Sequence, residues 1–129
     1  MAGTDVFINT TQAVPMTGGI AQGLTAFAGG AQATFTNGVQ NTGLVLGAIN
    51  TVSTVATAGD SGTLAADLGP GQSVIVRNEA AINSMNVFPP VGGTINGAAA
   101  NAAFALAAGK TGMFVCLDQG LTWVAILSA

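Results

Sequence analysis

From about Thr42 onward, short apolar runs alternate with turn residues, a pattern that predicts strands. The runs are rich in β-branched and aromatic residues, and Gly, Pro, Asn and Asp separate them. Pro89-Pro90 is a strong break, because Pro cannot donate a hydrogen bond in a sheet ladder. We expect strands at residues 43–49, 51–56, 63–68, 73–78, 85–88, 103–106, 112–117 and 121–127.

Strands of this length and spacing predict an all-β fold, either a β-sandwich or a jelly-roll-like barrel. Residues 97–108 depart from the pattern, because their alanines favour helix. One short helix in that segment is therefore the alternative. We assign residues 41–129 to the β-sandwich domain.

The first 40 residues have a different character, since they are rich in Gly, Thr, Gln and Ala. Their large apolar side chains are too sparse to bury the area that would offset the entropy of ordering the segment. We expect residues 1–40 to form an extended N-terminal arm that becomes ordered against a neighbour, with a flexible tail as the alternative. Its candidate interaction residues are Val6, Phe7, Ile8, Val14, Phe27 and Phe35.

Two segments repeat each other with an offset of 38 residues. Residues 71–78 align with residues 109–116, and the same shift places Leu68 on Leu106 and Met85 on Trp123. Each unit begins its apolar strand after a Gly, which adopts the positive φ that chain reversals need. We expect two related β units that form the two halves of one sandwich. The alternative is a chance similarity of composition.

The last two predicted strands flank Asp118-Gln119-Gly120, which predicts a hairpin with Gly in a left-handed position. Trp123, the only Trp, is expected to pack in the core, and it is also a candidate for a subunit contact. Cys116 stands alone between Val115 and Leu117, where a buried thiol is expected.

Only 5% of the residues are charged, against about 25% in an ordinary soluble domain. Two basic residues cannot neutralise a run of phosphates, so no nucleic-acid partner is expected. The absence of His removes the usual general base and the usual ligands of catalytic zinc. No apolar stretch reaches 18 residues, so no membrane-spanning helix is predicted. We expect no enzyme activity and no cofactor.

Two short strings imitate catalytic motifs. Gly59-Asp60-Ser61-Gly62 matches the surroundings of a protease nucleophile, but a serine needs a base and an oriented partner for that base. We expect a turn there, with Gly and Asp supplying its geometry and the hydroxyl capping it. Gly109-Lys110-Thr111 ends like a phosphate-binding loop, yet Phe104 stands where that motif needs its first Gly. A β-turn with an exposed Lys is expected.

Arg77 and Glu79, two residues apart on a strand, are expected to share a face.

Three tracts carry a family resemblance: VIVRN (74–78), MNVFPPVGGTING (85–97) and ANAAFALAAGK (100–110). With a closing hairpin that contains a Trp, they resemble small structural proteins of tailed-bacteriophage virions, over roughly residues 40 to 127. Members of this group are head decoration (cement) proteins or other minor virion proteins.

The resemblance implies a decoration protein at the capsid surface of a virion, with the major capsid protein as partner. It also implies a homo-oligomer, which we expect to be a trimer. A tail or head-fibre component with the same sandwich is the alternative. A small ice- or carbohydrate-binding module, suggested by the Thr, Ala and Gly content, is the alternative of another class.

Overall fold

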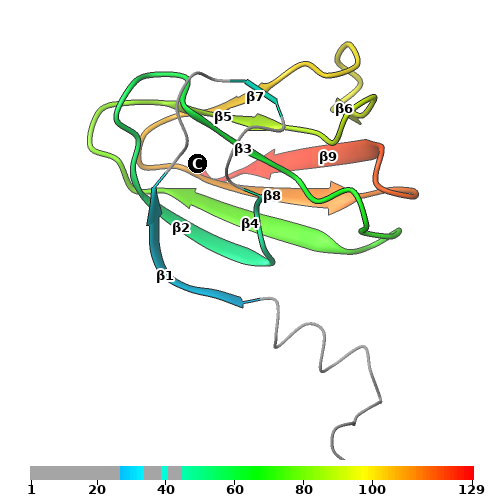
Figure 1. Ribbon diagram of the computed structural model, residues 1–129, viewed down its shortest axis with the longest axis horizontal. Coiled ribbons are helices and arrows are strands. Elements are labelled where there is room, and N and C mark those ends of the chain that lie inside the picture. Colours follow the sequence, from blue (N-terminus) through cyan, green and yellow to red (C-terminus); the bar gives the residue numbers. More distant parts are fainter. Residues whose placement is uncertain (1–26, 34–38, 41–44) are drawn as a thin grey trace, which may run out of the picture.

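The computed structural model describes residues 27–33, 39–40 and 45–129, which form two β-sheets packed as a sandwich (Figure 1). No helix is present among these residues, so the predicted all-β fold is confirmed. The larger sheet contains, in order across it, β1 (Phe27–Ala33), β2 (Ile49–Thr54), β4 (Ser73–Asn78), β8 (Thr111–Cys116), β9 (Thr122–Leu127) and β6 (Thr94–Ile95). The smaller sheet contains β3 (Ser61–Thr63), β5 (Met85–Phe88) and β7 (Phe104–Leu106).

From β2 to β8 the chain alternates between the two sheets, one strand in each. This alternation explains why β2 and β4 are parallel neighbours, because the connection between them crosses through β3 of the other layer. The pairs β4–β8 and β8–β9 are antiparallel, and the predicted terminal hairpin is β8–β9. Its loop contains Gly120 at φ +94°, as expected from the sequence.

The core lies between the two layers. Trp123 and Phe114 are its largest fully buried side chains and come from the large sheet, whereas Met85, Val87 and Leu106 come from the small one. Phe104 of β7 meets Phe114 of β8 edge to face, with ring centroids 5.5 Å apart. Cys116 is fully buried and free, which confirms the expectation for this thiol.

The 38-residue repeat corresponds to a local two-fold relation within the β4–β8 ladder. Ile75 stands opposite Met113 at the centre of the ladder, and these two residues are 38 apart. Hydrogen bonds occur in equivalent pairs: Gly71 N donates to Cys116 O and Gly109 N donates to Asn78 O, both at 2.8 Å. The side-chain donors of Asn78 and Cys116 likewise reach the carbonyls of Leu106 and Leu68.

This relation corrects one expectation, because the two units are not the two halves of the sandwich. Their apolar strands β4 and β8 lie side by side in one sheet. Their return strands separate: β5 belongs to the small sheet and β9 to the large sheet. The repeat therefore builds the middle of the large sheet.

Several predicted boundaries hold and others do not. The strands 73–78 and 85–88 are confirmed to the residue. The strands predicted at 103–106 and 121–127 each begin one residue later, and the one predicted at 112–117 is shifted by one residue, to 111–116. The strand predicted at 63–68 is wrong, since β3 ends at Thr63 and the chain then turns beneath the hairpin loop, with Gly120 against Ala66 O. The helix alternative for 97–108 is also wrong, because Gly97 and Asn101 adopt positive φ, which a right-handed helix does not accommodate.

Part of the segment expected to be an arm is a strand. Residues 27–33 form β1, which pairs in parallel with β2 and lies at the edge of the large sheet (Figure 1). The pairing shifts register twice, between Phe27 and Ala31 and between Gln32 and Ala33. The residues before Phe27 therefore connect to the large sheet at this edge.

Candidate interaction surface

The side of the large sheet that faces away from the core carries an unusual share of apolar side chains. Strand residues alternate between core and outside, so the non-core positions of β2, β4, β8 and β9 share one surface, here called the outer face. Six of its members are apolar: Ile49, Ile75, Met113, Val115, Val124 and Ile126. The others are Thr51, Ser53, Ser73, Arg77, Thr111 and Thr122.

The register places four of these apolar residues in a line across the strands. Ile49 lies opposite Ile75, Ile75 opposite Met113, and Met113 opposite Ile126. We call these four residues the apolar row. Ile49, Met113 and Ile126 are 42%, 37% and 54% exposed, which is far above the core value near zero. Val115 and Val124 form a second apolar pair beside the row. The outer face is thus a continuous apolar surface and not a set of scattered side chains.

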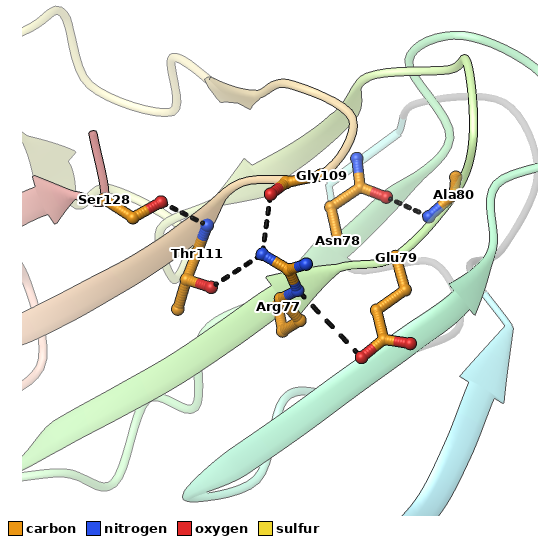
Figure 2. A network of polar contacts seen from close by, with 7 residues as sticks. All are labelled: Arg77, Asn78, Glu79, Ala80, Gly109, Thr111 and Ser128. Carbon is orange, nitrogen blue, oxygen red and sulfur yellow. Dashed lines mark hydrogen bonds and ion pairs between the residues drawn. The ribbon is translucent and has the colours of Figure 1, made fainter.

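A network of polar contacts lies at one end of the outer face (Figure 2). The Arg77 guanidinium donates to Gly109 O at 2.6 Å and to the Thr111 hydroxyl at 3.4 Å, and its Nε lies 4.0 Å from a Glu79 oxygen. Because both side chains of the ion pair remain about half exposed, the pair adds little stability, although it neutralises the only charge on the face. Glu79 lies one residue beyond the end of β4, and the ion pair shows that the two side chains meet. We call this the Arg77 end.

The opposite end of the sheet is acidic. Asp118 caps the β8–β9 loop by accepting hydrogen bonds from the backbone N–H groups of Leu121 and Thr122, at 3.0 and 2.9 Å. Bonds from the Thr122 side chain and backbone hold the pKa of the Asp118 carboxyl below its ordinary value. Asp67 is exposed on the neighbouring loop. We call this the Asp118 end.

The candidate interaction residues fall in three different situations. Trp123 is fully buried and its indole N–H donates to Gly120 O at 2.8 Å, so it is a core residue and offers no side chain to another subunit. Phe27 begins β1, where its backbone lies opposite Ile49. The remaining candidates lie outside the described residues: Val6, Phe7, Ile8, Val14 and Phe35.

The two imitation motifs are both turns. Gly59 adopts φ +92° and the Asp60 carboxylate accepts from Thr57 N at 2.9 Å, which confirms the predicted turn. The capping group was wrongly predicted, because the Ser61 hydroxyl is buried in β3 and donates to Val39 O instead. At the second motif the turn is confirmed by Lys110 N donating to Ala107 O. The Lys110 side chain is partly buried and donates to Ala129 O.

Sequence reasoning missed the apolar row, although a signal for it was present. In residues 112–117 and 121–127, apolar side chains occupy consecutive positions and so fall on both faces of the strand. Such a pattern is typical of strands that are covered on both sides. In the described structure only one side of β8 and β9 packs against the second sheet.

Among the described residues, no group of three or more His, Cys, Asp or Glu side chains is placed to hold a metal ion. In that same part of the chain, no helix is long and apolar enough to span a bilayer. No family model, curated protein or solved structure matches this chain.

Proposed function

We propose that this protein is a non-enzymatic structural component of a phage virion, which binds the outer surface of the capsid as a decoration protein and stabilises the shell. The observation that carries the proposal is the outer face: an exposed surface with a continuous apolar row and no unpaired charge, on a domain whose polar side chains hydrogen-bond within its own turns. The phage-like tracts at residues 74–110 supply the kind of assembly.

A surface of this kind suits burial between subunits. Few charges mean a small desolvation cost, and apolar side chains contribute about 25 cal/mol for each Å² removed from water. A protein that stabilises by contact area needs such surfaces and does not need a pocket. The fully buried amides of Asn50 and Asn78 hydrogen-bond to backbone groups of their own chain. They stabilise the domain and take no part in binding a ligand.

Attachment to the shell is assigned to the N-terminal segment. Residues 1–26 contain most of the candidate interaction residues and precede the edge strand of the large sheet. Because these residues precede a strand at the sheet edge, they can bind a neighbouring subunit without disturbing the sandwich core. The partner is the major capsid protein, and several copies of the chain act together as a homo-oligomer.

Co-sedimentation with capsid shells of the encoding phage that lack this protein tests the proposal. The full chain is expected to bind in hundreds of copies per shell, and a chain without residues 1–26 is expected to bind more weakly with an unchanged circular dichroism spectrum. Keeping β1 in the truncated chain leaves the large sheet complete. Absence of the full chain from the shells would refute decoration, and a few copies per virion would indicate the tail or head-fibre alternative.

The module of another class gains no support from the outer face. An ice-binding surface needs regular rows of Thr, but the row that contains Thr51 and Thr111 is interrupted by Arg77 between them. The only Trp is buried and therefore cannot serve as a stacking platform for a sugar.

A further inference from the structure

We propose that the outer face is a self-association surface, on which a second copy of this chain packs face to face with its strands running in the opposite direction. Apolar row then lies on apolar row. Three properties of the described residues select this partner: the arrangement of the row, the charges at the two ends of the face, and the size of the surface.

The apolar row is complementary to itself. A two-fold axis that runs along the row reverses the strand direction and places each row residue over the same residue of the second copy. Ile75 and Met113 then occupy the centre of the contact, because they form the middle pair of the β4–β8 ladder. No charged side chain lies in the row, so the contact leaves no buried unpaired charge. A contact that uses the same patch on both copies closes as a dimer.

The charges at the two ends favour the antiparallel arrangement. At the Arg77 end, Arg77 is paired with Glu79, and the Lys110 ammonium donates to Ala129 O at 2.6 Å. The Asp118 end carries the two carboxylates of Asp67 and Asp118. Asp60 also belongs to the loops of the Arg77 end, but it is 3% exposed and lies beside the small sheet, where its backbone pairs with Asn86. Antiparallel stacking keeps the acidic Asp118 ends of the two copies apart, whereas parallel stacking brings the Asp67 and Asp118 carboxylates of both copies together.

The size of the face predicts a weak dimer. Four strands about 4.8 Å apart and six residues long at about 3.4 Å per residue give a projected area of about 400 Å² per copy. The two faces together cover about 800 Å² of projected area, which places the contact at the small end of specific complexes, whose buried accessible surface is roughly 1,200–2,000 Å². The pairing is therefore concentration-dependent in solution. It departs from the trimer expected from the phage resemblance.

Sedimentation velocity of the purified full chain, without capsid, tests the proposal over about 1 μM to 1 mM. We expect a reversible monomer–dimer equilibrium, and we expect Met113→Lys to raise the dissociation constant at least about tenfold, because it places a charge at the centre of the contact. The matched control is Ile82→Lys, since Ile82 is 83% exposed on the β4–β5 loop and is not one of the strand residues that form the outer face. It should change the dissociation constant by less than about twofold.

A second variant keeps the test sharp if Met113→Lys unfolds. Met113→Gln adds a polar group without a charge and should also raise the dissociation constant, while Ile82→Gln in the same conditions should not. A monomer at all concentrations, a mass of three copies, or equal effects of the Met113 and Ile82 substitutions would overturn the proposal. These measurements contain no shell, so a chain that stays monomeric and still binds capsids would refute the pairing and leave the decoration function intact.

Discussion

Removal of the Trp123 side chain should destabilise this domain more than any other single truncation in β9. The indole is fully buried between the layers, and its N–H donates to Gly120 O at 2.8 Å. Gly120 packs closely against the backbone on its other side, since it adopts φ +94° and a Cβ there would clash with Ala66 O. The site is therefore held rigidly on the side of the hairpin loop.

Two substitutions separate packing from hydrogen bonding at this site. Trp123→Ala leaves a cavity and should lower the free energy of unfolding by about 3–5 kcal/mol. Trp123→Phe keeps an aromatic ring but leaves the buried Gly120 carbonyl without its donor, which costs about 1–3 kcal/mol. Domains of this size have a total stability of about 5–15 kcal/mol, so the alanine variant loses a large part of it.

The assay must avoid tryptophan fluorescence, because Trp123 is the only Trp in the chain. Urea unfolding followed by far-ultraviolet circular dichroism, at a concentration that keeps the chain monomeric, gives the free energies. Ile126→Ala is the matched control in the same strand: its side chain is 54% exposed on the outer face, and the loss should be below about 1 kcal/mol. An unfolding midpoint for Trp123→Ala equal to that of Ile126→Ala would refute the core assignment.

Three further outcomes are expected in the same unfolding assay. Asn78→Ala removes bonds to Asn83 O, Leu106 O and Ala80 N from a fully buried position and should cost about 2–4 kcal/mol; a loss below about 0.5 kcal/mol would contradict the bonding described. Gly120→Ala should cost about 2 kcal/mol or more, through positive φ and the clash with Ala66 O, and wild-type stability would exclude that backbone. The lowered pKa of Asp118 stabilises the fold above the ordinary value of 3.8, and this contribution is lost as the pH falls through the folded-state value. Asp118→Asn should therefore make the free energy of unfolding fall less steeply as the pH is lowered. An unchanged fall would show that Asp118 does not contribute to the acid sensitivity.

Strand prediction succeeded where turn residues bound a strand and failed where a polar residue lies inside one. Gly71 lies shortly before the first residue of β4, and Pro89 follows the last residue of β5. Both strands were predicted to the residue. Asn50 was interpreted as a break between two strands, yet it lies within β2. Its buried amide bonds Gly47 and Ile75, so it joins β2 to β4 instead of ending a strand. Composition does not distinguish a turn Asn from an Asn that bonds a neighbouring strand.

The outer face was harder to predict because it depends on register. Ile49, Ile75, Met113 and Ile126 are far apart in the sequence and become neighbours only through three strand pairings. Apolar residues on both faces of β8 and β9 indicate that something covers the second face, but they do not indicate which strands continue it. The candidate interaction residues were instead chosen as the large apolar side chains of the N-terminal segment. The only candidate within the predicted sandwich domain, Trp123, belongs to the core.

The two ends of the outer face differ because the two units of the internal repeat differ at the positions beside its centre. Across the local two-fold relation of the β4–β8 ladder, Ile75 corresponds to Met113, so the centre of the face is apolar in both units. The flanking positions differ, because Arg77 of the first unit corresponds to Val115 of the second. Two apolar residues at those positions would give a face without direction, on which parallel and antiparallel copies pack equally well. Arg77 with its Glu79 partner makes one end of the face polar, and the Asp67 and Asp118 carboxylates at the other end disfavour the parallel arrangement of two copies.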